Sequence, residues 1–276
     1  MTDPRPTGSE PLPDWAAAAR PGRRVGNRVE FHPEIGSTND QARAALVEGG
    51  PDGLAVVADR QLAGRGRMGR TWLSPAGVNL LVSVGLRLDL PAERAWWLAA
   101  GAALALRSAA QEAVGQAAPL SVRWPNDLVT SDGLKVSGLL VETEIEGARV
   151  VWSVIGMGLN VNWRRENMPS DIASGATSLA DLAGRDVDRV ALLGGLLAAL
   201  DGEVNRIETG TSPQVRFQSA SWLTGREIEV ETPAGRLAGV AGAIADDGGL
   251  VLDGPTIQTT VTVGEVIRVH ATAVAG

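Results

Sequence analysis

The segment from Gly64 to Arg70, GRGRMGR, carries the side chains whose chemistry is easiest to interpret. It places three arginines within six residues of a glycine-rich turn. Glycines let the backbone fold closely around a ligand, and guanidinium groups donate forked hydrogen bonds to phosphate or carboxylate oxygens. Like charges this close repel one another when no anion is present. We therefore predict an anion-binding loop that is disordered when empty and ordered around its ligand.

The same segment formally matches the G-x-G-x-x-G pattern of dinucleotide-binding folds. That fingerprint needs a helix to begin inside the motif, so that the helix N-terminus holds a pyrophosphate. Here the chain continues as TWLSP, and Ser74-Pro75 and Gly77 oppose a helix. Three arginines would also crowd the backbone. These features disfavour a dinucleotide site, and a solvated basic turn remains the simplest alternative to an anion-binding loop.

Lysine usage singles out one further cation. Lysine and arginine together number 25, and Lys135 is the only lysine. Lysine is a compact point charge on a flexible stem, whereas arginine is a wide planar fork. A composition that uses arginine wherever any cation suffices leaves lysine where arginine fails. We interpret Lys135 as a functional cation; the alternative is that one lysine persisted by chance.

Uncharged polar residues adjoin these cations. Ser37, Thr38 and Asn39 begin a predicted helix, and Gln61 precedes the arginine loop. Taken alone, the serine and threonine are explained as a helix N-cap. The same hydroxyl and amide groups would also suit a polar ring such as a ureido group. Both interpretations remain open on these residues alone.

The elements that must position these residues alternate between strand and helix patterns. Strands are predicted at 29–35, 53–59 and 78–88 and again within 120–162, with a hairpin turn at 131–134; helices are predicted at 37–50, 91–115 and about 186–208. From residue 226 onward the pattern changes to short strands separated by PAG and DDGG turns. We expect a small β-barrel there, after an α/β or α+β domain.

Composition excludes several classes of site. There is no cysteine, so disulfides, thiolate metal sites and cysteine nucleophiles are ruled out. Two histidines cannot form a His-rich metal site. A net charge of −7 opposes bulk nucleic-acid binding. The longest apolar stretch, 95–106, is too short to cross a bilayer, and no secretory signal is evident, so we expect a cytoplasmic protein.

Several motifs, in this order, resemble those of the bacterial biotin protein ligases. They are STN at 37–39, Q-x-x-GRGRxGRxW at 61–72, WPND at 124–127, GxKxxGxLxE at 133–142 and GxGxN at 156–160. The resemblance covers roughly residues 29–270 and is closest to the monofunctional class, which lacks an N-terminal DNA-binding domain. It implies a catalytic domain akin to class II aminoacyl-tRNA synthetases, followed by an SH3-like barrel. We expect a disordered arm at 1–27, the catalytic domain at 28–222 and the barrel at 223–276.

The resemblance implies a two-step ligation. Biotin and ATP would form biotinyl-5′-AMP with release of pyrophosphate, and biotin would then pass to a specific lysine of a biotin carboxyl carrier protein. Mg²⁺ is the expected cofactor, and positioned cations would stabilise the charge that builds on the phosphoryl group. The expected partner is the carrier domain of an acyl-CoA carboxylase, with no DNA and no membrane. A monomer or weak dimer is expected.

The resemblance also implies roles for individual residues. The catalytic cations would be Arg65, Arg67 and Lys135. Biotin would contact Ser37, Thr38, Asn39, Gln61, Gly64, Arg65, Gly66, Arg67 and Lys135. ATP and the adenylate would contact Arg67, Arg70, Trp72, Asn126, Lys135 and Asn160. Asp127 is the expected metal ligand, with Glu142 and Glu144 as other candidates by residue type.

Two positions depart from the family pattern. Arg123 stands where the family commonly has lysine, and Met68 stands where some members carry another arginine, which would remove one phosphate contact. Two other functions remain open: a lipoate protein ligase of related fold, and a non-enzymatic biotin or nucleotide sensor. An arginine-rich RNA-binding module is disfavoured by the negative net charge.

Overall fold

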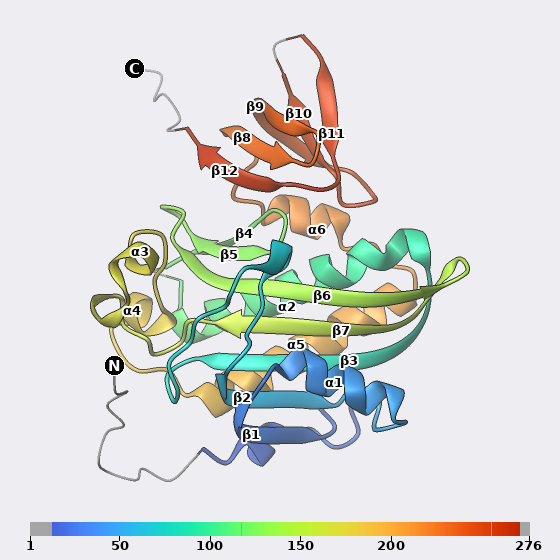
Figure 1. The fold of residues 1–276 in the computed structure, drawn as a ribbon, viewed down its shortest axis with the longest axis vertical. Helices are drawn as coiled ribbons and strands as arrows, with labels where there is room; N and C mark the ends of the chain where they lie inside the picture. Colours follow the sequence, from blue (N-terminus) through green and yellow to red (C-terminus); the bar gives the residue numbers. More distant parts are fainter. Residues whose placement is uncertain (1–12, 117, 255, 271–276) are drawn as a thin grey trace.

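A computed structural model describes residues 13–270 except 117 and 255 (Figure 1). Its larger sheet has seven strands in the order β1-β2-β3-β7-β6-β5-β4. Only β1 and β2 are parallel, joined by the crossover helix α1 (Thr38–Val47), and the other neighbours are antiparallel. The strands are β1 (Val29–Ile35), β2 (Ala55–Gln61), β3 (Leu80–Pro91), β4 (Leu120–Arg123), β5 (Asp127–Thr130), β6 (Lys135–Glu146) and β7 (Arg149–Leu159). The predicted mixed α/β class is confirmed.

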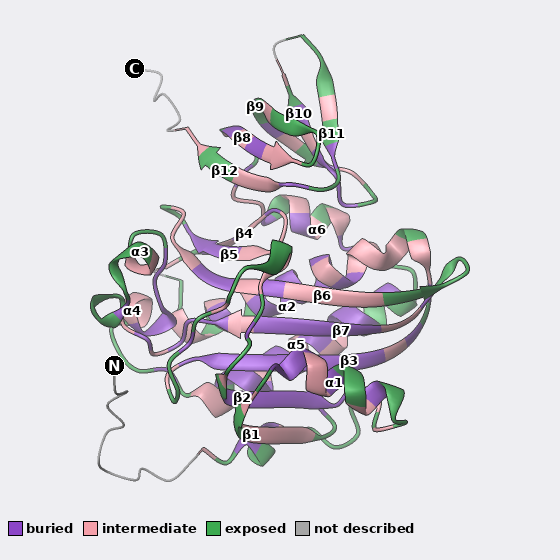
Figure 2. Cartoon of the chain, in the orientation of Figure 1, coloured by how far each residue is buried: buried purple, intermediate pink, exposed green. Residues whose placement is uncertain are grey.

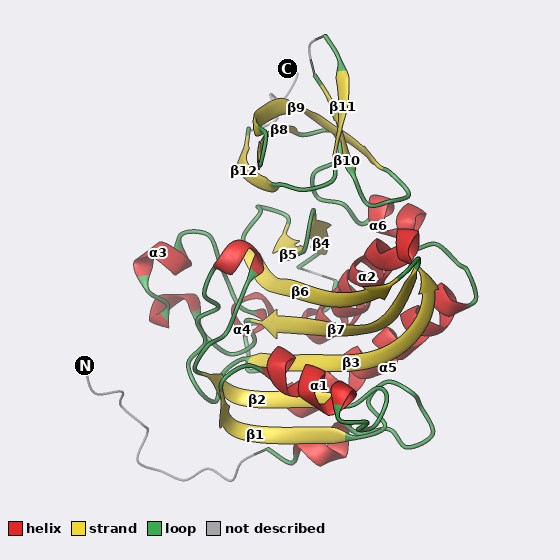
Figure 3. Ribbon diagram, turned by 45° about the vertical axis from the view of Figure 1, so that its right-hand side comes forward, coloured by secondary structure: helices red, strands yellow, loops and turns green. Residues whose placement is uncertain are grey.

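The two faces of this sheet are covered unequally. Helices α2 (Ala95–Val114) and α5 (Arg189–Glu208) pack together on one face, and α1 lies on the other (Figure 3). The central strands β2, β3 and β7 are mostly buried (Figure 2). Because α1 has only ten residues, it covers only part of its face of the sheet. Within 13–270, no helix is long and apolar enough to cross a membrane.

Short helical segments connect the main elements. The one-turn segments are η1 (Trp15–Ala18), η2 (Arg67–Gly69), η3 (Ala92–Arg94) and η4 (Arg165–Asn167), and the short α-helices are α3 (Ser170–Ala173), α4 (Leu179–Ala183) and α6 (Gln214–Ser219). Helix α4 begins with a capping box, in which the Ser178 side chain accepts from the Asp181 amide. The same turn lies against the GxGxN segment, because the Leu179 amide donates to the Asn160 carbonyl at 2.9 Å.

The C-terminal strands form a separate five-stranded antiparallel sheet in the order β11-β10-β9-β8-β12. They are β8 (Glu227–Thr232), β9 (Gly235–Ile244), β10 (Leu250–Asp253), β11 (Gln258–Val261) and β12 (Glu265–Val269). This arrangement is consistent with the predicted SH3-like unit. Several contacts tie it to the rest of the chain; in one of them, the buried indole of Trp124 donates to the Gly248 carbonyl at 2.9 Å.

The expectation of a disordered arm over 1–27 is wrong for residues 13–27. Trp15 is only 2% exposed, and Val25 is fully buried. The Trp15 ring stacks on Phe31 with centroids 5.9 Å apart, and the Arg189 guanidinium lies 5.2 Å from the Trp15 ring centroid. Proline-rich composition suggested disorder, but the burial of Trp15 and Val25 and the ion pairs of Arg24 outweigh it. Residues 1–12 lie outside the described part of the chain.

Replacing Trp15 with alanine is expected to lower the free energy of unfolding by about 3–5 kcal/mol, the usual cost of truncating a buried aromatic side chain. Urea denaturation measures this change. Trp15→Phe, which keeps an aromatic ring against Phe31, should recover much of the stability. An unchanged unfolding free energy in Trp15→Ala would show that this segment does not pack as described.

Candidate active site

A cavity of about 260 Å³ opens on the face of the large sheet that carries α1. It gathers residues from five separate motifs of the sequence. Most of the predicted site residues line it, namely Ser37, Thr38, Asn39, Gln61, Arg65, Gly66, Arg67, Arg70, Trp72, Asn126, Lys135 and Asn160. Two predicted residues, Gly64 and Asp127, are not among the lining residues. Gly64 is buried and accepts a hydrogen bond from the Trp72 amide at 2.9 Å.

The floor of the cavity is built from glycines on β6 and β7. Gly138 lies opposite Gly158 in the strand register, and Gly156 lies two residues away on the same face. A Cβ on Gly156 would stand 2.1 Å from Asn39 Oδ1, and one on Gly158 would stand 2.7 Å from the Trp72 ring. The side chains above therefore rest directly on the sheet backbone. The motifs contained these glycines, but no role was predicted for them.

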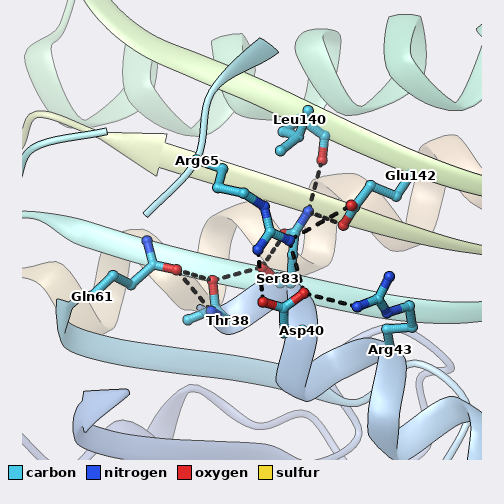
Figure 4. A network of polar contacts seen from close by, with 9 residues as sticks. Thr38, Asp40, Arg43, Gln61, Arg65, Ser83, Leu140 and Glu142 are labelled. Atoms are coloured by element: carbon cyan, nitrogen blue, oxygen red, sulfur yellow. Dashed lines mark hydrogen bonds and ion pairs between the residues drawn. The ribbon is translucent and has the colours of Figure 1, made fainter. Parts of the chain in front are cut away.

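One end of the cavity is polar and lies at the start of α1 (Figure 4). The Thr38 amide and hydroxyl donate to Gln61 Oε1 at 2.7 and 3.0 Å. Ser83 Oγ lies 2.7 Å from Thr38 Oγ1 and 2.6 Å from Asn39 Oδ1, although its single proton can serve only one of them. Asn39 Nδ2 donates to Glu142 Oε2 at 2.8 Å. This network fixes the donors and acceptors that a ligand meets.

Ser83 was missed by the sequence analysis. It is fully buried, and it joins Thr38 to Asn39 from β3. The available pattern was a lone hydroxyl within the apolar run LLVSV. A buried polar side chain needs partners, so such a residue indicates a buried network even when its partners are unknown.

Ser37 does not act as a conventional helix cap. It occupies the N-cap position with extended backbone, but its side chain makes no capping hydrogen bond. The residue is 4% exposed and lines the cavity. Among the described residues its hydroxyl has no hydrogen-bond partner, so it can serve a ligand.

The arginine loop crosses the open face of the sheet as a strap, defined as residues 64–72. The Arg65 guanidinium makes two hydrogen bonds to Asp40, at 2.7 and 2.8 Å. Arg70 pairs with Glu265 at the start of β12. The predicted repulsion among the arginines is thus offset by carboxylates of the protein itself, which the sequence analysis had not considered. Opening of the strap in the empty protein stays a prediction.

Arg67 differs from its two neighbours. Within the described residues it has no ion-pair partner. Burial lowers the pKa of its guanidinium below the ordinary value, although the nearby carboxylates of Glu265 and Asp127 oppose that shift. A half-buried cation without a paired carboxylate favours binding of an anion. Met68, next to it, is exposed at the tip with φ of 55°.

Lys135 lies in the middle of the cavity. Its Nζ is 2.6 Å from Asp127 Oδ1 and 5.5 Å from the centroid of the Trp72 ring. Arg123 donates to the other oxygen of Asp127 at 2.7 Å. Trp72 Nε1 is buried with no hydrogen-bond partner in the described part of the chain. Lys135 is therefore held by an acid on one side and an aromatic face on the other.

Asp127 does not fit its predicted role as a magnesium ligand. Both of its oxygens lie against cations, Arg123 and Lys135. Glu142 is bonded to Asn39, and Glu144 is exposed. No group of three acidic or histidine side chains suited to a metal exists among residues 13–116, 118–254 and 256–270. These residues do not form a protein-built magnesium site.

The far end of the cavity is apolar, and sequence reasoning missed it. Trp163, Ile172 and Ala176 line this end and pack together. Asn126 and Asn160 direct their amide groups to backbone carbonyls, at 2.6 Å to Leu139 and 3.1 Å to Thr177. The cavity thus runs along β7, from a polar end through a cationic middle to an apolar end.

Known proteins resemble this chain in both sequence and fold. Residues 34–160 match the biotin/lipoate A/B protein ligase family. The chain is 33% identical over 231 residues to the bifunctional ligase/repressor BirA of Bacillus subtilis, covering 83% of this chain and 70% of that protein. It is 32% identical over 271 residues to the biotin–[acetyl-CoA-carboxylase] ligase of Mycobacterium tuberculosis, covering 96% and 97%. The structure of biotin protein ligase from Aquifex aeolicus in complex with biotin and ATP aligns with a TM-score of 0.71 and 27% identity, covering 87% and 97%.

Proposed function

The chain belongs to the biotin/lipoate A/B protein ligase family, and on this premise we propose that it is an ATP-dependent biotin protein ligase. It forms biotinyl-5′-AMP from biotin and ATP and transfers biotin to a lysine of a carrier protein. The observation that carries this proposal is the order of environments along the cavity. A polar end, a cationic middle and an apolar end match a ligand with a ureido ring, a phosphorylated carboxylate and a planar base.

At the polar end, we propose that the ureido ring binds beside Ser37, Thr38, Asn39 and Gln61. The Ser37 hydroxyl, which has no hydrogen-bond partner among the described residues, supplies a hydrogen bond to the ring. Glycines under this end allow the ring to lie against β7. The apolar body of the ring then contacts backbone, and its polar groups meet the fixed amide and hydroxyl network.

The middle of the cavity serves the chemical step. A carboxylate oxygen of biotin attacks the α-phosphorus of ATP, and the bond to pyrophosphate breaks. Two anions must approach each other, so positioned cations lower the barrier. Lys135 and Arg67 are the cations that we assign to this step. Lys135 lies in the middle of the cavity, although it also pairs with Asp127, and Arg67 has no ion-pair partner among the described residues, whereas Arg65 and Arg70 pair with carboxylates outside the cavity lining. We expect any Mg²⁺ to be held by phosphate oxygens and water rather than by Asp127.

Transfer to the acceptor needs no nucleophile from the enzyme. The neutral amine of the acceptor lysine attacks the carbonyl carbon of the adenylate, AMP leaves, and the amine loses a proton. We propose that the acceptor is the biotin carrier domain of acetyl-CoA carboxylase, which the name of the full-length Mycobacterium tuberculosis relative supports. The strap, by covering the cavity, protects the mixed anhydride from water until that domain arrives.

Calorimetric titration with biotin and with lipoate tests the substrate, and mass spectrometry of a biotin carrier domain incubated with enzyme, ATP and biotin tests the reaction. We expect binding of biotin, and an acceptor heavier by one biotinyl group at its lysine. Binding of lipoate alone would favour the lipoate ligase. Binding of biotin without pyrophosphate release would indicate a sensor rather than an enzyme.

A further inference from the structure

The strap is attached to the rest of the protein at both of its ends. Near its start, Arg65 contacts Asp40 in the first turn of α1, and its Nη2 also lies 3.7 Å from Glu142 Oε1 on β6. Near its end, Arg70 contacts Glu265, the first residue of β12, which lies 195 residues further along the chain. Figure 4 shows the contact of Arg65 with Asp40, and Figure 1 shows α1 and β12 on opposite sides of β6 and β7. One anchor belongs to the catalytic domain and the other to the C-terminal sheet.

The two carboxylates differ in how they are engaged. Asp40 accepts two hydrogen bonds from Arg65 and one from Arg43 at 3.0 Å. The hydrogen bonds from Arg65 hold the pKa of the Asp40 carboxyl below its ordinary value. Glu265 pairs with Arg70 alone among the described residues. The C-terminal sheet therefore presents this carboxylate to the strap and to no other cation.

The central part of the strap depends on these anchors. Arg67 lies between Arg65 and Arg70 and has no carboxylate of its own within the described chain. Backbone hydrogen bonds from Gly66 to Arg70 and from Trp72 to Gly64 close the strap on itself, at 2.6 and 2.9 Å. The strap is thus a small closed unit, held by the ion pairs near its two ends and by the Trp72 ring against the sheet. Release of either end would move Arg67 relative to the cavity.

We propose that Asp40 and Glu265 are positioning residues that hold the strap across the cavity, so that the C-terminal sheet takes part in retaining the adenylate. The part that concerns the adenylate rests on the proposed function. Both ion pairs are partly exposed, with Arg65 39% and Arg70 56% exposed, so each contributes modestly to closure. Loss of one anchor is expected to increase strap opening by about two- to fivefold.

Trypsin reports strap opening directly, because the strap contains Arg65, Arg67 and Arg70. Cleavage after Arg65 and Arg67 is followed by mass spectrometry in the full-length protein without ligand. We expect Glu265→Gln and Asp40→Asn to raise that cleavage rate about two- to fivefold. Glu231→Gln is the matched control, since Glu231 faces Glu265 across the sheet but pairs with Arg236. Equal cleavage in Glu265→Gln and the wild type would overturn the C-terminal anchor.

A charge exchange separates the ion pair from general loosening of the fold. Glu265→Arg alone should raise cleavage after Arg67, and combination with Arg70→Glu should reverse much of that increase. An additive effect of the two changes would contradict a direct pair. The unfolding midpoint of Glu265→Gln should stay at the wild-type value, because the residue contacts the strap and not the core.

The adenylate is tested separately. Enzyme loaded with labelled biotin and ATP is diluted into unlabelled biotin, and loss of bound label is timed without acceptor. Glu265→Gln should lose its adenylate about two- to fivefold faster than the wild type, with Glu231→Gln unchanged. If the wild type forms no adenylate, the proposed function fails, while the proteolysis result still decides whether the anchors exist. Faster proteolysis with unchanged adenylate loss would overturn the retention role.

Discussion

Replacing Lys135 with alanine is expected to lower the rate of adenylate formation by about 10²-fold or more, as loss of one preorganised charge can. The structure adds a second reason for a large effect. In the wild type, the negative charge of Asp127 is balanced by both Lys135 and Arg123. In Lys135→Ala, only Arg123 would balance the charge of this carboxylate beside the cavity. An incoming carboxylate or phosphate would then lose the positive charge that it now meets, beside a carboxylate neutralised by Arg123 alone.

Replacing Lys135 with arginine should also impair the reaction, though less. The Nζ rests close to the sheet, because a Cβ on Gly138 would stand only 3.1 Å from it. A planar guanidinium is wider than an ammonium and cannot occupy this position without displacing Trp72 or the sheet contact. Single-turnover pyrophosphate release measures both variants, with the exposed Arg268→Ala as control. Near-normal release by Lys135→Ala would remove this lysine from the mechanism.

The strands and long helices of the fold could be predicted because their patterns are local. Alternation and apolar runs placed β1, β3 and the two long helices close to their observed bounds. The end of β2 was predicted at residue 59 but lies at Gln61. Strand ends are set by pairing with a neighbour, and β1 pairs with β2 as far as Ile35 and Gln61. No local pattern contains that information.

Candidate site residues could be predicted where they belong to short motifs and not where they depend on distant partners. The hydroxyl and amide groups at 37–39 and the strap arginines share one cavity as expected. Asp40 and Glu265 were not predicted, because an acidic residue near an arginine in space leaves no trace in the sequence around either. Trp163, Ile172 and Ala176 lie outside the five motifs, and no local pattern distinguishes them from ordinary core residues.

The N-terminal segment shows how composition can mislead. A proline-rich, glycine-rich stretch with several arginines is typical of disorder. Residues 13–27 are nevertheless held against the domain, by the indole of Trp15 beside Phe31, by buried Val25 and by the ion pairs of Arg24. Composition averages over a window, whereas a single large apolar side chain contributes most of the burial in a short segment.

Replacing Gly156 with alanine is expected to weaken biotin binding by on the order of 10- to 100-fold, since overpacking of this kind costs about 1–3 kcal/mol and 1.4 kcal/mol is tenfold. The added Cβ would stand 2.1 Å from Asn39 Oδ1 and 2.9 Å from its Cγ. Asn39 must therefore move. It cannot move freely, because Ser83 and Glu142 hold its two amide atoms at 2.6 and 2.8 Å. The whole polar end of the cavity would shift with it.

Calorimetric titration with biotin measures the loss of biotin affinity in Gly156→Ala. Two further variants serve as controls. Gly195→Ala adds the same methyl group on α5 with no atom within 4 Å, so its biotin affinity should equal that of the wild type. In the double variant Gly156→Ala with Asn39→Ala, the added methyl group no longer collides with the Asn39 side chain, but the Asn39 amide is lost as well. Its biotin affinity should therefore lie below that of the wild type. Wild-type affinity in Gly156→Ala alone would mean that biotin does not bind at this end of β7. In that case the ureido ring would have to be assigned elsewhere in the cavity, and the roles of Ser37, Thr38 and Asn39 with it.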